Sequence, residues 1–170
     1  MTYVSPFNTP DSDHDSGLDP LCMSRAHSVD VIDTLAEFYL AAEATIRDRA
    51  SLPAFFLARQ LAELSLKALV GDYRETKLRN SHNLTALLDA LASRNDELFD
   101  GDSERTHIVA FIRDMQKHDE RGDQGRYPEA TDGTPSLSTI CCADPELLAR
   151  EIERMYLYVG RRIRSAQLAR

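Results

Sequence analysis

The chain has no tryptophan, and only three cysteines, seven glycines and seven prolines occur among its 170 residues. Two of the cysteines, Cys141 and Cys142, are adjacent, and adjacent cysteines rarely bridge each other. The sequence also lacks a Cys-x-x-Cys pair and any histidine-rich spacing of the kind that holds zinc. We therefore expect reduced thiols and predict no metal or other cofactor.

Long apolar runs are missing as well. No stretch of 18 or more apolar residues occurs, so no membrane span is expected. The first residues lack the basic start and apolar stretch of a secretory signal. These absences predict a cytoplasmic protein, and the length suits one domain with a single core.

Positive charge is in short supply, with 20 Lys and Arg against 28 Asp and Glu and a net charge of −8. This balance argues against a surface built as a whole to hold nucleic acid. Residues 1–22 contain four aspartates and no Lys or Arg, whereas the chain from Tyr156 onward contains arginines and no acid. A local basic patch on an acidic protein therefore stays open.

The main pattern in the sequence is the helical spacing of its apolar residues. Residues 1–25 are rich in Ser, Asp, Pro and Gly and are predicted to form an acidic flexible arm, followed by a helical domain over 26–170. Apolar residues at spacings of three and four predict helices over 29–49 and 51–70, a short one from 84, one from 103 and a last one from 145. A long loop over 119–143 precedes the last helix. We predict an all-α fold, an up-and-down bundle of about five helices.

One cluster of chemically capable residues stands where the fourth predicted helix meets this loop. Arg113 and His118 have four residues between them, and Asp114 follows the arginine directly. This spacing resembles the motif of HEPN ribonucleases, small helical bundles in which four to six residues separate an arginine from a histidine. A second resemblance, to HEPN-like bacterial proteins, rests on three ordered motifs: Glu63…Lys67-Ala68-Leu69, His82-Asn83-Leu84 and Arg126-Tyr127-Pro128.

The resemblance implies a metal-independent endoribonuclease with Arg113 and His118 as catalytic residues and Asp114 in support. A histidine suits removal of the 2′-hydroxyl proton near neutral pH, and an arginine suits the growing charge on the phosphate. A five-residue step on an ideal helix turns by about 140°, so Arg113 and His118 share a face only if the helix ends or bends between them. The alternative for His118 is a side chain packed at the end of a core helix.

Three further residues are candidates for ligand binding. His82 stands at a helix start near amides that favour anions, or it serves only as a helix-entry residue. Lys67 stands four residues after Glu63, which is also the spacing of a simple surface ion pair. Arg126 either holds phosphate or braces the long loop. The terminal arginines are solvated helix-end charges or contacts for an RNA backbone.

Two functions of different classes remain open. The first is the endoribonuclease, which the resemblance places in toxin–antitoxin, phage-defence or RNA-processing systems. Its expected partners are RNA, a second copy in a homodimer, and a cognate antitoxin or defence-system protein. The second is a non-catalytic HEPN-like module that oligomerises or binds a nucleotide or protein. A weaker third hypothesis is a toxin-neutralising partner whose acidic arm covers a basic site.

Overall fold

The computed structural model describes residues 31–71, 81–94, 96–122, 126–129, 133–140 and 142–168. They form five α-helices, namely α1 (Val31–Arg47), α2 (Ser51–Val70), α4 (Leu84–Ala92), α5 (Ser103–His118) and α6 (Pro145–Leu168), and a short 3-10 helix, η1 (Glu97–Phe99). All of them belong to one compact unit, Val31–Arg170. The predicted all-α class is confirmed, and the described ranges contain no strand. The predicted arm lies outside the described residues.

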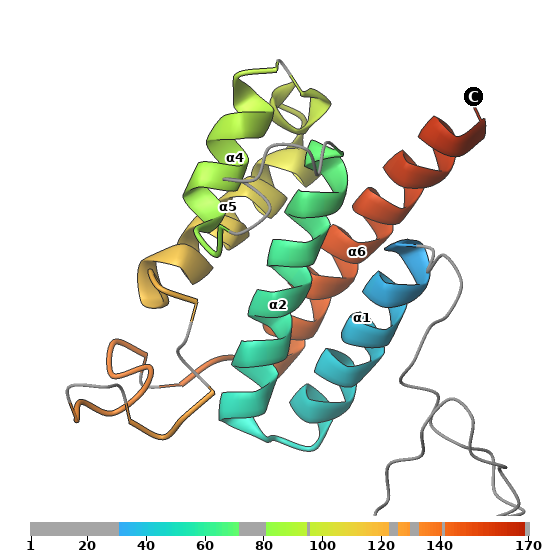
Figure 1. The fold of residues 1–170 in the computed structure, drawn as a ribbon. Coiled ribbons are helices and arrows are strands. Elements are labelled where there is room, and N and C mark those ends of the chain that lie inside the picture. Colours follow the sequence, from blue (N-terminus) through green and yellow to red (C-terminus); the bar gives the residue numbers. More distant parts are fainter. Residues whose placement is uncertain are drawn as a thin grey trace, which may run out of the picture. The chain divides into compact units, whose positions relative to one another are not determined.

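The helices pack as an up-and-down bundle around α2. In Figure 1, α2 lies between α1 and α6 on one side and α4 on the other, and it contacts all three. Residues 48–50 connect α1 to α2, so these two helices run side by side in opposite directions. α5 packs against α4, η1 and α6. No helix of the described part is both long and apolar enough to cross a membrane.

The helix ends follow the capping residues of the sequence. The side-chain oxygens of Asn83 and Asp102 each accept a hydrogen bond of 3.0 Å from a first-turn amide of α4 and α5. Asp144 caps α6 in the same way. Gly71 ends α2 in the left-handed conformation with φ 67°. The helix predicted from 103 begins at Ser103, and Asp102 is its cap.

The core is apolar and surrounds α2. Leu61 of α2 is buried, while Leu57, Leu64 and Ala68 of the same helix are partly buried. The stripes of the other helices supply most of the remaining buried residues: Leu35, Ala42, Ile46, Leu84, Leu87, Leu88, Leu91, Ile108, Ile112, Met115, Ile152, Met155 and Val159.

The long loop before α6 has little regular structure in its described residues. One antiparallel bridge pairs Glu129 with Pro135, and the amide of Ser136 donates to the carbonyl of Pro128 at 2.9 Å. The loop begins at the end of α5 and leads back to the start of α6 (Figure 1). It therefore joins the end of α5, where Asp114 and His118 lie, to the start of α6.

Candidate functional site

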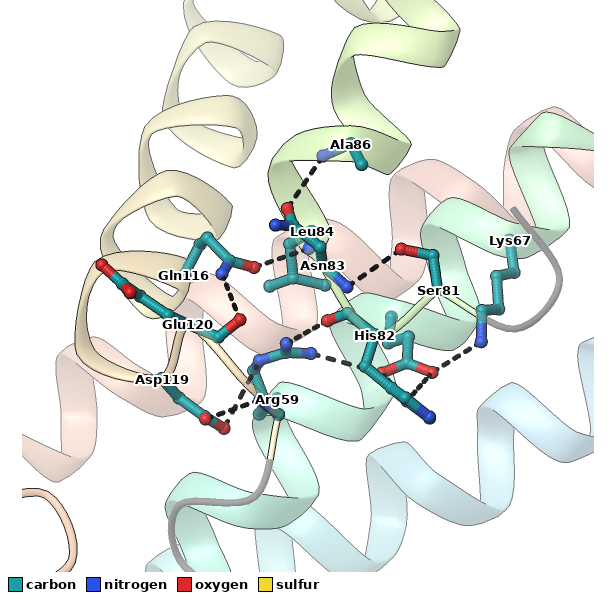
Figure 2. A network of polar contacts seen from close by, with 12 residues as sticks. Arg59, Lys67, Ser81, His82, Asn83, Leu84, Ala86, Gln116, Asp119 and Glu120 are labelled. Atoms are coloured by element: carbon teal, nitrogen blue, oxygen red, sulfur yellow. Dashed lines mark hydrogen bonds and ion pairs between the residues drawn. The ribbon is translucent and has the colours of Figure 1, made fainter. Parts of the chain in front are cut away.

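A buried ionic network lies where α2, the segment before α4 and the end of α5 meet (Figure 2). Its centre is Arg59 of α2, whose side chain is 0% exposed. The Arg59 guanidinium donates to the carbonyl of His82 and, at 3.4 Å, to the Glu63 carboxylate. Its Nε lies 3.7 Å from Oδ2 of Asp119, which is also buried. One side chain thus joins three parts of the chain that are distant in sequence.

The charges of this network balance, with Arg59 and Lys67 as cations and Glu63 and Asp119 as carboxylates. Burial lowers the pKa of Arg59, and the charges of Asp119 and Glu63 oppose that effect. Burial alone would raise the pKa of Glu63, but the hydrogen bond and charge of Lys67, followed by those of His82, hold it below its ordinary value. Glu63 therefore stays ionised inside the protein because its partners surround it.

Polar groups of α5 and the following turn complete the network. Gln116 accepts a hydrogen bond of 2.6 Å from the Leu84 amide and donates one of 3.0 Å to the Glu120 carbonyl. Asp119 accepts a hydrogen bond of 2.7 Å from the Gly122 amide. The last turn of α5 is consequently fixed against the start of α4.

Two of the predicted ligand-binding residues converge on this network. Lys67 lies 2.7 Å from the Glu63 carboxylate, and the Nδ1 of His82 lies 3.1 Å from the same oxygen. The interpretation of Glu63 and Lys67 as a surface ion pair is wrong, because Glu63 is only 3% exposed and is held by three partners. The His82 side chain is 56% exposed, so it forms the solvent side of the network. Asn83 rather than His82 caps α4.

Arg126 lies apart from these residues. It is exposed, and its guanidinium lies over the ring of Phe56 in α2, 5.3 Å from the ring centre. This cation–π contact attaches the long loop to α2. The geometry therefore agrees with the bracing role that was one of the two hypotheses for Arg126.

An open groove of about 1150 Å³ lies beside the same end of α5. The α1–α2 turn, α5, the second part of the long loop and the start of α6 form its walls. Its lining combines aromatic and apolar side chains with ionisable ones, among them Arg49, Phe55, His107, Phe111, Asp114 and His118.

His118 is the candidate catalytic residue that faces this groove. Its Nδ1 lies 2.8 Å from the hydroxyl of Thr139, and its Nε2 lies 3.8 Å from the carboxylate of Asp114. The side chain is 24% exposed, so His118 is not sealed into the core. The structure thus brings Asp114 and His118 together, as their spacing of four predicts.

Arg113 does not join them. Its side chain is exposed and is not part of the groove lining. Within the described ranges, no hydrogen bond or ion pair connects Arg113 with His118. α5 stays helical through His118, so the five-residue step leaves the two side chains on different sides of the helix.

The terminal arginines are mostly engaged within the bundle. Arg162 pairs with Asp96 at 3.0 Å and Arg161 pairs with Glu104 at 2.8 Å. The hydrogen bond to Asp96 raises the pKa of Arg162 above its ordinary value. These two side chains tie α6 to η1 and α5, so they are not simply solvated helix-end charges.

Sequence reasoning missed Arg59, Gln116 and Asp119. A signal for Arg59 was present, because Arg59, Glu63 and Lys67 alternate in charge at steps of four on a helix that is apolar on its other sides. In the described part of the chain, no group of three His, Cys, Asp or Glu side chains could hold a metal ion. Comparisons of the chain with family models, curated proteins and solved structures found no match.

Proposed function

We propose that this protein is a metal-independent endoribonuclease in which His118 is the acid–base residue. The observation that carries the proposal is the position of the imidazole at the edge of an open groove, with one nitrogen oriented by Thr139. A histidine held in this way has the ordinary requirements of a general base, namely a fixed ring and one accessible nitrogen. The resemblance to HEPN ribonucleases points to the same residue.

The chemistry follows from the two ring nitrogens. When Nδ1 carries the proton and donates a hydrogen bond to the Thr139 hydroxyl, Nε2 is left as the acceptor, because Asp114 lies beyond hydrogen-bond distance from it. Nε2 then removes the proton of a 2′-hydroxyl, and the 2′-oxygen attacks the adjacent phosphorus. The bond from phosphorus to the 5′-oxygen breaks, and the 5′-oxygen takes a proton from water. The products are a 2′,3′-cyclic phosphate and a 5′-hydroxyl.

The role of Arg113 in this proposal requires a second chain. Arg113 lies on an exposed side of α5, away from the groove of its own chain. In a homodimer formed through faces near α5, the arginine of one chain and the histidine of the other would complete one site. HEPN ribonucleases, which this chain resembles, pair two motifs in this way. Such a protein would serve in RNA processing or in toxin–antitoxin or phage-defence systems.

Cleavage of a labelled single-stranded RNA tests the proposal. We expect the wild-type protein to cut it in the presence of EDTA and to leave the cyclic phosphate, whereas His118→Ala and Arg113→Ala each lose at least about a hundredfold in rate. His107→Ala is the matched control, because His107 lines the same groove about 16 Å farther along the α5 axis. Sedimentation of the samples at micromolar concentration should show a dimer. Cleavage that survives the change at His118, or stops with EDTA, would contradict the mechanism.

A non-catalytic module that binds a nucleotide or protein is the second candidate. The observation that favours it is the separation of Arg113 from the groove within one chain, together with the net charge of −8. The same assay separates the two functions. A wild-type protein that is folded and dimeric but cleaves no RNA would support the module.

A further inference from the structure

α1 ends with an arginine at a left-handed position where helices usually have glycine. The amide of Ala50 donates to the carbonyl of Thr45 at 2.9 Å, and the amide of Arg49 donates to that of Ile46 at 3.1 Å. These two bonds define a Schellman motif, whose left-handed position is normally occupied by glycine. Here that position is Arg49, with φ 60°, whereas α2 uses Gly71 at the corresponding place.

A second non-glycine residue, Leu137, has a positive φ of 55°. Among the described residues, Arg49 and Leu137 are the only two of this kind, and both line the groove. Side chains other than glycine rarely adopt this backbone conformation, and such residues concentrate at functional sites. The backbone therefore presents an arginine to the groove at a position where glycine would be more stable.

The charges in the groove distinguish Arg49 further. The acidic residues of the lining have partners, since Asp144 caps α6, Glu151 pairs with Arg154, and Asp114 lies 3.9 Å from Lys117. In contrast, no hydrogen bond or ion pair holds the Arg49 guanidinium within the described part of the chain. A cation without a partner at the edge of a groove is suited to bind an anionic group.

The rest of the lining indicates what accompanies that anion. Phe55 and Phe111 are both partly buried and contribute aromatic surface to the groove. Aromatic side chains beside an arginine form the arrangement that binds single-stranded nucleic acid, because bases stack on rings while the phosphates are held by cations. His118 lines the same groove, so an extended ligand that fills the groove would meet both Arg49 and His118.

We infer that Arg49 is the phosphate-binding residue of the groove, and that the groove takes single-stranded RNA. The inference rests on the proposed function for the identity of the ligand. It assigns to Arg49, in the same chain as His118, a phosphate-binding task in addition to the one that the proposed function gives to Arg113 of the second chain. Arg49 is thus a binding residue that the sequence motif does not contain.

Binding of a fluorescein-labelled, single-stranded 2′-deoxy hexanucleotide tests the inference, because this probe cannot be cleaved. We expect Arg49→Ala to raise the dissociation constant by about 10- to 100-fold, which is the effect of losing a charged hydrogen bond. Arg49→Lys should retain part of the affinity. The matched control is Arg47→Ala, which removes the same charge two residues earlier and outside the groove lining. Equal weakening in the two alanine variants, or no binding by the wild type, would overturn the inference.

Arg49→Gly supplies a second readout. It should weaken binding as much as Arg49→Ala while raising Tm by about 2–4 °C, because glycine relieves the left-handed conformation. An unchanged or lower Tm would show that the left-handed conformation of Arg49 does not destabilise the protein, and would overturn that part of the argument. RNA cleavage by the same variants separates the two proposals. Cleavage that does not depend on Arg49 would overturn this inference alone, and Arg49-dependent binding without cleavage would overturn the nuclease alone.

Discussion

Arg59 is the residue on which the ionic network depends. Its guanidinium is fully buried and contacts Glu63, Asp119 and the carbonyl of His82. Replacing one partner of a buried ion pair costs about 3–5 kcal/mol, because the remaining charges stay buried without compensation. We therefore predict that Arg59→Met lowers the free energy of unfolding by that amount, as measured by urea denaturation at pH 7.

Arg47→Met is the control for this change. Arg47 is 75% exposed and pairs only with its neighbour Asp48, so its replacement should alter stability by less than about 0.5 kcal/mol. If Arg59→Met unfolds at the same urea concentration as the control, methionine fills the site as well as the ion pairs do. The network would then have no structural role.

At the residue scale, predictions from the sequence succeeded where the spacing lies within one helix. Asp114 and His118 lie together because a step of four on a helix places them on one face. The contact of Lys67 with Glu63 follows from the same rule. The burial of Glu63 does not follow from it, because burial depends on which parts of the chain pack over α2. Arg59 could not be paired with Asp119 from the sequence, since only the assembled bundle brings them close.

The turn after α5 packs against the ionic network. Gly122 has φ 76°, and a Cβ at this position would lie 3.1 Å from the Cβ of His82 and 3.3 Å from a nitrogen of Arg59. Gly133 has a similar φ of 80°, and a Cβ there would meet nothing within 4 Å. These two glycines form a matched pair, because both substitutions strain the backbone and only one also crowds the network.

We predict that Gly122→Ala destabilises the protein by about 1–3 kcal/mol more than Gly133→Ala does. Thermal denaturation of both variants measures the difference. Gly122→Ala should also slow any cleavage that His118 supports, because Asp119 and Gln116 hold the last turn of α5. Equal Tm values for the two variants would mean that the turn yields to the added methyl group at no cost.

At the element scale, the helices were predictable because local signals define them. Asn83 and Gly71 are placed by capping chemistry that involves only a few neighbouring residues. The groove was not predictable, because the α1–α2 turn, α5 and residues 136–148 meet only in three dimensions. For the same reason the motif pointed to Arg113, while Arg49 is the arginine that lines the groove.

On the scale of the whole molecule, one helix organises the fold. α2 contacts α1, α4 and α6. Its fully buried Arg59 pairs with Asp119 at the end of α5. The fold class and the central core were predictable, because short connections and apolar stripes specify an antiparallel bundle. The buried apolar side chains of the described residues all belong to the unit Val31–Arg170.

This last property leads to a prediction about residues 1–25. These residues contain four aspartates and few apolar side chains, so they offer little apolar area to bury. We predict that a chain beginning at Ser24 keeps its helical content and unfolds cooperatively within about 2 °C of the full chain, as followed by circular dichroism. Leu35→Ala in the full chain is the control for real core damage, because Leu35 is buried in α1 and its truncation costs about 2–5 kcal/mol. If removing the arm lowers Tm as much as that change does, the arm packs on the bundle or on a partner subunit.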